Sequence, residues 1–392
     1  MKIKNTIVIN SFLMALFIMQ YTYMLPLMNF ISPSICIAIS GMVIMAAIII
    51  NNRKVLFNKL VLLITVIIAY VLAMKVCFDN SDAGILIVYS YTTIPAALMV
   101  SYSIDWTLLL EYLYKISVLS FFLVFWNPLL GTYSYMRFGY AVLPILIFII
   151  IHLFYNKANK TIPGIVNLYD YIICGFLGIE LLIFGARGAM LSLILFFIIE
   201  EMLINRSHLS RKVALFIAAL LAYFNLAVII NAFFSISRAY GIRSYALSKI
   251  NMHINRGLEA SSSGRVELYG ETFEKIMQHP FFGNAISLTQ EDGLGVSYSH
   301  NLFLQVWMDL GIGGLIAVVI IIILAFLFIM SRRNEIKARI LIASLLSISI
   351  GRLLVSSVLW RRPEFWIFVF CTIVVSKSVR KKNIKRVGEK LC

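Results

Sequence analysis

The chain has 392 residues, of which 61% are hydrophobic and 13% are charged, whereas an average soluble domain has about 45–50% apolar and about 25% charged residues. This composition excludes an ordinary soluble domain. Because the apolar residues come in long uninterrupted blocks, it predicts an all-α polytopic integral membrane protein. The formal net charge of +16 fits a nucleic-acid partner, an anionic membrane surface or a topology signal until the charges are located along the chain.

Apolar blocks of about 20 residues are long enough to cross a bilayer, and they predict about twelve transmembrane helices. In chain order these are 7–26, 31–50, 60–78, 85–103, 108–126, 141–155, 165–184, 187–204, 213–231, 307–330, 340–359 and 364–376. The chain then divides into nine spans within 1–231, a polar loop over 232–306, three spans within 307–376 and a basic tail over 377–392. We expect the first span to be retained, because no small-residue cleavage site follows it.

Basic residues set the predicted orientation, because Lys and Arg are enriched in short cytoplasmic loops. If the N-terminus is inside, the inside loops collect the basic clusters at 2–4, 53–59, 157–160, 206–212, 332–339 and 377–390. An even number of spans puts both termini in the cytoplasm and the loop 232–306 on the extracytoplasmic face. Up to Tyr298 this loop has six basic and six acidic residues. The net charge therefore indicates orientation, and a nucleic-acid partner loses its main support.

The loop 232–306 contains one helical pattern, at 265–278. Ser261 to Gly264 form a start signal and His279-Pro280 a stop signal. At helical spacing, apolar side chains gather on one face and acidic side chains on the other. The apolar face consists of Val266, Tyr269, Phe273, Ile276 and Met277. Arg265 lies at the margin of this face, which indicates that it is directed at something other than solvent.

A histidine precedes the tenth span. We expect His300 in the first turn of that helix, with Ser299 as its N-cap. A helix N-terminus disfavours the imidazolium form, so this position favours a neutral imidazole that is able to act as a base at pH 7. In the seventh span, Glu180 is expected to pair with a basic residue of a neighbouring helix.

Three elements of the sequence, in this order, resemble the superfamily of O-antigen ligases and O-antigen polymerases, membrane enzymes that build bacterial surface polysaccharides. They are Gly185-Ala186-Arg187-Gly188-Ala189, with Ala186 where the family usually has Ser; Ser263-Gly264-Arg265 followed by His279-Pro280-Phe281-Phe282-Gly283-Asn284; and Ser299-His300-Asn301-Leu302-Phe303-Leu304-Gln305 followed by Asp309-Leu310-Gly311-Ile312-Gly313-Gly314. The last two elements cover about 55 residues and are specific as a set.

The resemblance implies a GT-C-like helical fold in the bacterial cytoplasmic (inner) membrane, with the active loop on its extracytoplasmic face. It implies a glycosyltransferase whose donor is an oligosaccharide joined to undecaprenyl pyrophosphate and whose acceptor is a sugar hydroxyl. The implied partners are this lipid-linked oligosaccharide and the bilayer, together with a chain-length regulator and a flippase, and the product is O-antigen of lipopolysaccharide or capsule.

Glycosidic bond formation releases the lipid pyrophosphate, whose charge needs cationic groups. The sequence has no Asp-x-Asp and no His/Cys cluster at metal spacing, so we expect neither a metal nor another cofactor. Guanidinium groups suit this task, since they stay charged and bind phosphate in a bidentate fork. The resemblance implies that the catalytic residues are His300, Arg265 and Arg187, with His300 as general base or acceptor-positioning group.

A second set is expected to bind the pyrophosphate or the glycan: Arg137, Tyr269, Asn301, Arg352, Arg361 and Arg362. Arg361 and Arg362 fit equally well with snorkelling to lipid head groups. Nothing in the sequence indicates an activated Ser or Cys nucleophile, so direct displacement with inversion is the simplest route.

Three functions compete. A polymerase transfers the glycan to another lipid-linked repeat unit, whereas a ligase transfers it to lipid A core, and the motifs are shared by both. A lipid-linked oligosaccharide flippase or other transporter needs coordinating groups near the midplane, often in paired repeats. The sequence shows no internal repeat, and its single large polar loop favours a site at one face.

Overall fold

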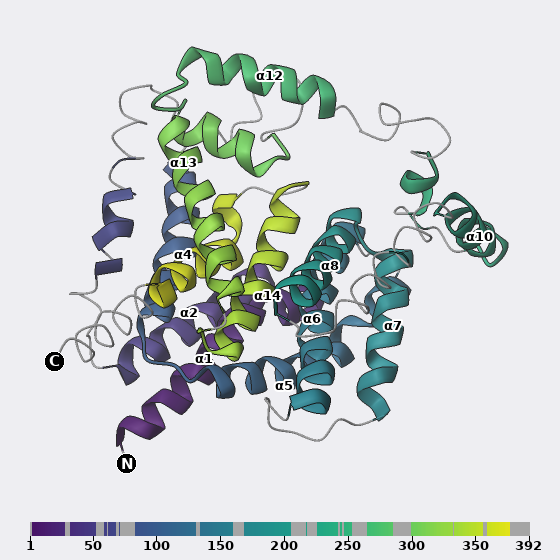
Figure 1. Cartoon of the computed structure of the whole chain (residues 1–392), viewed down its shortest axis with the longest axis horizontal. Helices are drawn as coiled ribbons and strands as arrows, with labels where there is room; N and C mark the ends of the chain where they lie inside the picture. The colour runs from purple at the N-terminus through teal and green to yellow at the C-terminus, as the bar shows by residue number, and fades with distance from the viewer. Residues whose placement is uncertain are drawn as a thin grey trace.

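The computed structural model describes residues 2–27, 32–51, 59–60, 62–67, 70, 83–130, 134–159, 168–204, 217, 226–241, 244, 247–252, 265–284, 299–331, 333–355 and 359–376. Within these ranges every regular element is helical (Figure 1). The main helices are α1 (Lys2–Leu27), α2 (Pro33–Ile50), α4 (Ala83–Ser101), α5 (Trp106–Val124), α6 (Tyr135–Asn159), α7 (Leu168–Phe184), α8 (Arg187–Ile199), α10 (Leu226–Ala239), α12 (Arg265–Gln278), α13 (Leu302–Met330), α14 (Ile336–Leu353) and a last helix over Pro363–Ser376. Three short turns complete them: η2 (Asn127–Leu130), the π-helical η3 (Glu200–Ile204) and η4 (Leu359–Arg361).

Four of the described helices are long and apolar enough to cross a membrane: Asn5–Met24, Trp106–Val124, Tyr135–Tyr155 and Leu302–Met330. Shorter apolar helices cover Ile35–Ile50, Thr92–Ser101 and Pro363–Ser376. These lengths fit an all-α membrane protein. The predicted spans 60–78 and 213–231 lie mostly outside the described residues, so the count of twelve stays a prediction.

Helix starts follow local sequence signals. The Asp105 side chain accepts hydrogen bonds from the backbone N–H groups of Thr107 and Leu108, at 2.8 and 3.1 Å, and so caps α5. Pro363 opens the last helix, where its missing N–H is not needed. Such capping satisfies donors that have no partner within their own helix.

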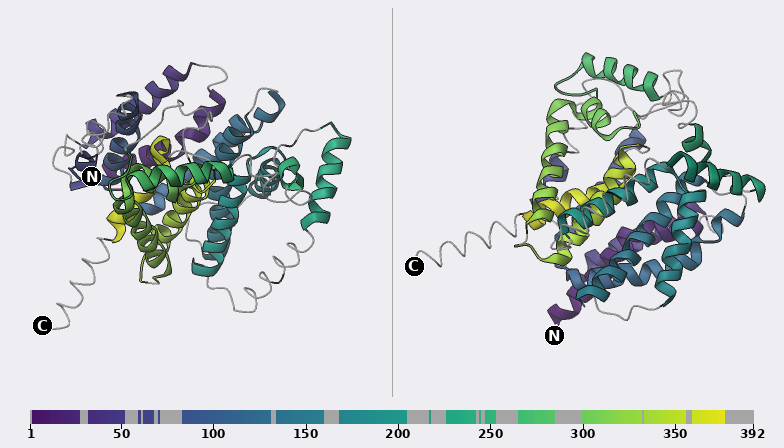
Figure 2. Two further views of the ribbon diagram at one scale, coloured as in Figure 1. Left: turned by 90° about the horizontal axis from the view of Figure 1, so that it is seen from above. Right: turned by 45° about the vertical axis from the view of Figure 1, so that its right-hand side comes forward.

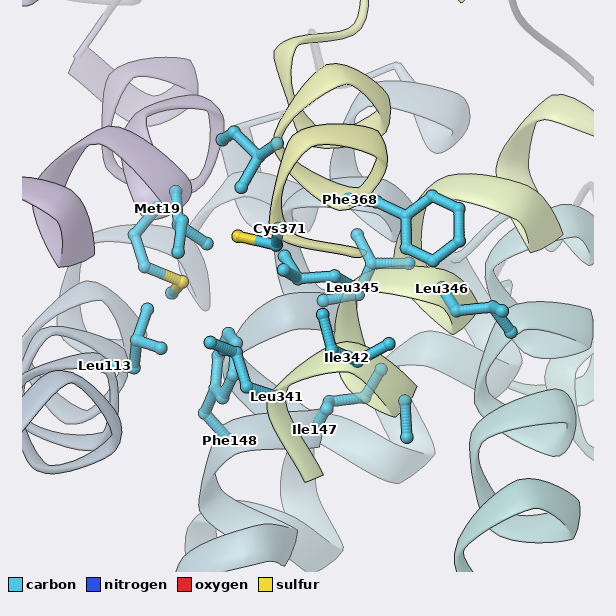
Figure 3. Packing of buried hydrophobic residues seen from close by; sticks show 14 of the residues in the cluster. Met19, Leu113, Ile147, Phe148, Leu341, Ile342, Leu345, Leu346, Phe368 and Cys371 are labelled. Carbon is cyan, nitrogen blue, oxygen red and sulfur yellow. The ribbon is translucent and has the colours of Figure 1, made fainter. Parts of the chain in front are cut away.

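The core lies around α6 and α14, which are buried along most of their length. Figure 3 shows Leu341, Ile342, Leu345 and Leu346 of α14 among side chains of four other helices. These are Met19, Leu113, Ile147, Phe148, Phe368 and Cys371. A helix that is apolar on all sides is expected in such a central position. α14 is therefore the axis of the bundle, and its ends reach both ends of the molecule.

Polar contacts gather at the two ends of the bundle. At one end Asn10 Nδ2 donates to Asn51 Oδ1 at 3.1 Å and Lys337 Nζ donates to Thr107 Oγ1 at 2.5 Å. α12 lies beyond the other end, as Figure 1 and the right view of Figure 2 show, and we call this the α12 end. These two contacts join the first part of α1 to the end of α2 and the start of α14 to the start of α5. Which end faces the cytoplasm is an expectation from the charges.

The segment before α12 differs from the sequence prediction. α10 (Leu226–Ala239) continues across residue 231, where the predicted span ends and the predicted loop begins, so helical structure extends past the predicted boundary at 231/232. Further on, the Ser244 hydroxyl donates to the carbonyl of Ile183 and accepts from Leu247 N at 3.1 Å. The loop is thereby fixed to the end of α7.

Candidate active site

The centre of the candidate site is a buried arginine in the last turn of α14. Arg352 is 6% exposed, and its guanidinium carbon lies 4.7 Å from the ring centroid of Tyr21 and 4.2 Å from that of Tyr140. Its Nη1 is 3.9 Å from Glu364 Oε1, which is too long for a hydrogen bond. Its buried Nε has no hydrogen-bond partner among the described residues. The charge is thus held by aromatic faces and a distant carboxylate, which leaves its N–H donors for something else.

Arg187 is the first residue of α8, which begins beside the cluster of Arg352, Tyr21 and Tyr140. The residue before it, Ala186, occupies the N-cap without a side-chain hydrogen bond, and the residue after it, Gly188, packs against the Tyr140 hydroxyl. A Cβ at position 188 would clash with this hydroxyl and, at 2.5 Å, with Val355 Cγ2. The glycine of the Arg187-Gly188 element therefore lets the start of α8 approach α6 closely, at the tyrosine that contacts Arg352.

Three further predicted arginines lie at the same end. Arg361 is exposed in η4, and Arg362, just after it, is half-buried with its guanidinium carbon 5.7 Å from the Tyr21 ring centroid. Burial and the neighbouring Arg352 charge lower the pKa of Arg362 to about 10, so it stays cationic at pH 7. Arg137 is exposed in the first turn of α6, three residues before Tyr140. The structure thus brings Arg352 and Arg362 together around Tyr21 and places Arg137 one helical turn from Tyr140.

Arg265 enters from α12, outside the bundle. α12 spans Arg265–Gln278, the bounds that the sequence pattern predicts, and Arg265 is half-buried at its first residue. The faces differ from the prediction: Thr272 and Ile276 are buried, whereas Phe273 and Met277 are about half exposed. Phe273 meets the Trp307 ring edge-on at 6.2 Å between centroids. Contact with the end of α13 therefore sets the orientation of α12, and the apolar pattern alone does not.

A joint between two family elements holds α12 in place. α13 is broken at Gly311, where φ is +69° and ψ is −172°, and this break frees the carbonyl of Met308 and the N–H of Ile312, which an unbroken helix would pair. Asn284 N donates to Met308 O at 2.7 Å, and Ile312 N donates to Pro280 O at 3.0 Å. The loop after α12 thus replaces one bond of α13 with two of its own.

Two glycines make this joint possible. A Cβ on Gly311 would overlap the Phe281 carbonyl, and a Cβ on Gly283, whose φ is +82°, would lie 2.5 Å from Asp309 O. Trp307 Nε1 adds a hydrogen bond to Pro280 O at 3.0 Å. The His-Pro-Phe-Phe-Gly element and the Asp-Leu-Gly-Ile element are therefore the two halves of one backbone contact.

His300 lies close enough to Arg265 to feel its charge. It precedes α13 with φ at +52°, the one positive φ of a non-glycine residue in the described ranges. Burial, followed by the positive charge of Arg265, lowers the pKa of His300 to about 4. The imidazole is therefore neutral at pH 7, as the sequence predicts, although the cause is burial and an arginine.

The helix cap differs from the prediction. The N-cap of α13 is Asn301, whose side-chain oxygen accepts from Phe303 N at 2.9 Å and from Leu304 N at 3.3 Å. Ser299 is one step too early, and its hydroxyl donates to Asn301 O at 3.0 Å. His300 is consequently outside the first turn of the helix. Of the predicted binding residues, Asn301 keeps only its amide nitrogen for a ligand, and Tyr269 is half-buried one turn after Arg265.

Several residues at the site escaped sequence reasoning. Tyr21, Tyr140 and Glu364 contact the arginines, and each belongs to a helix whose apolar pattern gives no signal of a site. The available signal in the sequence was that each of them is a polar residue within an apolar span. Glu180 is another such residue: it is 7% exposed and makes no ion pair with any described residue, so the predicted pairing stays a prediction.

Comparison with known families gives one match. Residues 172–319 match the family model described as O-antigen ligase. The matched range runs from α7 to the middle of α13 and contains Arg187, Arg265, His300 and the joint at Gly311. A comparison with curated proteins gave no match. The match confirms the resemblance noted from the sequence, and it supports transfer of the ligase or polymerase type in general.

Proposed function

Because residues 172–319 match the family model described as O-antigen ligase, we propose that the protein is a polysaccharide polymerase. It transfers an oligosaccharide from undecaprenyl pyrophosphate to the sugar hydroxyl of another lipid-linked repeat unit, on the extracytoplasmic face of the cytoplasmic membrane. The acceptor oxygen forms a bond to the anomeric carbon of the donor. The bond from that carbon to the phosphate oxygen breaks, and its electron pair leaves with the pyrophosphate.

One observation carries this proposal: Arg352 is buried with an unused Nε, beside Arg362 and close to Arg187. A buried guanidinium cannot lose its charge, and leaving its donors without partners is costly. A pyrophosphate offers several oxygens that accept from such donors in bidentate pairs. The same contacts stabilise the charge that develops on the leaving group as the glycosidic bond forms.

His300 is suited to take the proton of the acceptor hydroxyl. Its imidazole is neutral at pH 7, and a base is needed only as the hydroxyl attacks. The positive φ is a strained conformation for a non-glycine residue, and such strain concentrates at functional sites. With one displacement and no covalent intermediate, the configuration at the anomeric carbon inverts.

A second candidate function is the ligase, whose acceptor is lipid A core. The specific observation in its favour is the description of the matching family, which is O-antigen ligase. The arginine cluster serves both functions equally, because the donor is the same and only the acceptor differs.

The experiment is a glycan profile of a strain from which the gene is deleted, complemented with wild type or with Arg352→Gln. A polymerase deletion leaves one repeat unit on the core, whereas a ligase deletion leaves the core bare and accumulates lipid-linked chains. Arg352→Gln should reproduce the deletion profile at normal protein level. The surface variant Glu111→Gln, which removes an exposed ion pair with Lys115, should restore wild-type chains. A wild-type profile in the deletion strain would reject both functions.

A further inference from the structure

The segment of α13 before its break also contacts η4 (Leu359–Arg361), the turn that leads into Arg362. Trp360 is fully buried, and its Nε1 donates to Asp309 Oδ2 at 2.8 Å. One helical turn earlier, Gln305 Oε1 accepts from Leu359 N at 3.4 Å. From the other side, Thr92 Oγ1 of α4 donates to Trp360 O at 2.7 Å. Three side chains from two helices therefore fix this turn.

Burial of the Asp309 carboxyl at this position is energetically unfavourable. Asp309 is 3% exposed, it makes no ion pair with any described residue, and its Oδ1 has no hydrogen-bond partner among them. Burying a carboxyl without full pairing costs free energy, and a leucine would pack there without this cost. The carboxyl does not neutralise the arginine cluster. Besides the Trp360 indole, the Gln305 side chain one turn earlier also hydrogen-bonds the Asp309 carboxyl, and neither partner is charged, so the contribution of Asp309 is geometric.

The turn η4 determines where Arg362 lies. Arg362 N donates to Leu359 O at 3.2 Å, and Phe365 N donates to Arg362 O at 3.1 Å, so η4 and the last helix form one continuous backbone unit. Rotation of the Trp360 ring would shift this unit and move the Arg362 guanidinium from the face of Tyr21, where its carbon lies 5.7 Å from the ring centroid.

We propose that Asp309 is a positioning residue that acts through the Trp360 indole to hold Arg362 in the pyrophosphate site. This inference rests on the proposed function, because it assumes that Arg362 binds the donor pyrophosphate. It gives the acidic residue of the Asp-Leu-Gly-Ile element a role separate from its neighbour Gly311: Gly311 holds the loop after α12, while Asp309 holds the turn before the last helix.

The test is equilibrium binding of undecaprenyl pyrophosphate to the full-length protein in detergent micelles. Trp360→Phe keeps a buried aromatic ring and removes the indole N–H donor together with part of the ring volume, so the melting temperature of each variant is measured beside its binding. We expect Trp360→Phe and Arg362→Gln each to weaken binding about tenfold, a change of about 1.4 kcal/mol. The double variant should also be about tenfold weaker, because both changes remove the same contact. Two independent effects would multiply to about 100-fold and overturn the proposal.

Substitutions of Asp309 give a second readout. Asp309→Leu should weaken binding about tenfold, whereas Asp309→Asn should stay within about threefold of wild type, since its amide oxygen still accepts from the indole. Glu111→Gln, the same carboxyl-to-amide change on the surface, should bind as wild type does. Equal binding by Asp309→Leu and wild type overturns the inference. If wild type itself does not bind undecaprenyl pyrophosphate, the proposed function fails. If wild type binds and Asp309→Leu binds equally well, only the inference about Asp309 fails.

Discussion

α14 carries two buried arginines at its two ends, and their surroundings differ. At the end opposite α12, Arg339 donates from Nε to Ile329 O at 2.5 Å and from Nη2 to Leu203 O at 2.8 Å. At the α12 end, Arg352 lies between two tyrosine rings with an unused Nε. Both side chains are about 5% exposed. Burial alone therefore does not separate a structural arginine from one that is set to bind a ligand.

The partners make the difference. Ile329 and Leu203 lie in the last turns of α13 and η3, where carbonyl groups lack donor partners within their own helix. Arg339 satisfies these carbonyls and opposes the negative end of the helix dipole. Glu200 is close by, where its Oε1 accepts from the Tyr155 hydroxyl at 3.1 Å. Arg339 thus closes a network of protein groups, while Arg352 leaves one open.

Exchange of each arginine for glutamine should separate the two roles. We expect Arg352→Gln to lower the rate of chain lengthening on the order of 10²–10³-fold, as loss of one transition-state donor does, with protein level and melting temperature near wild type. Arg339→Gln should cost about 3 kcal/mol of stability, because it leaves buried groups without partners. Thermal unfolding in detergent and in vitro lengthening of lipid-linked repeats measure the two effects. Loss of stability in Arg352→Gln with a normal rate would reverse the assignment.

The joint at Gly311 offers a test of whether α12 must be held against the bundle. Gly311→Ala places a Cβ against the Phe281 carbonyl at a φ that favours glycine, so we expect about 1–3 kcal/mol of strain and about a tenfold slower reaction. Gly313→Ala, two residues on, meets open space within the helix and should leave the rate unchanged. Equal rates for both variants would show that the joint does not position Arg265 or His300.

The pH profile tests the link between α12 and His300. The base acts as a neutral imidazole, so wild-type activity should fall only below about pH 4, the lowered pKa of His300. Arg265→Gln removes the second cause of this shift and leaves burial, so the pKa should rise part of the way toward 6.5. Because burial is the larger cause, its residual activity should begin to fall near pH 5, at a higher pH than that of wild type, while Arg265→Lys should keep the wild-type acid limb. If Arg265→Gln and Arg265→Lys had superimposable acid limbs, Arg265 would have no influence on the pKa of His300.

The sequence predicted the helical class and the bounds of α12, because apolar blocks and a period of 3.6 residues are local signals. It also named Arg187, Arg265 and His300 through their family elements. It did not predict the break at Gly311, since Gly311, Gly313 and Gly314 lie in one long apolar run that is typical of a continuous helix. It also missed the Ser299-to-Asn301 shift of the cap, because both residue types suit an N-cap.

The residues that contact Arg339 and Arg352 could not be predicted from the sequence for a different reason. Tyr21, Tyr140 and Arg352 come from three helices, and only packing brings them together. Arg339 and Arg352 look alike in the sequence, as single cations near the ends of an apolar run. What distinguishes them is which carbonyl groups lie within reach, and that depends on where α13 and η3 end.

Glu180 tests whether the comparison of Arg339 with Arg352 also applies to a buried acidic residue. It is as buried as Arg352, and its Oε2, like Arg352 Nε, has no hydrogen-bond partner among the described residues. A carboxyl group differs from a guanidinium in one respect, since it can bind a proton and become neutral without a ligand. We therefore expect Glu180→Gln to keep the rate within about twofold and the melting temperature unchanged, measured as for Arg352→Gln. A tenfold loss of rate at normal stability would mean that this carboxyl, too, contacts substrate, and that an unused buried charge marks the site whatever its sign.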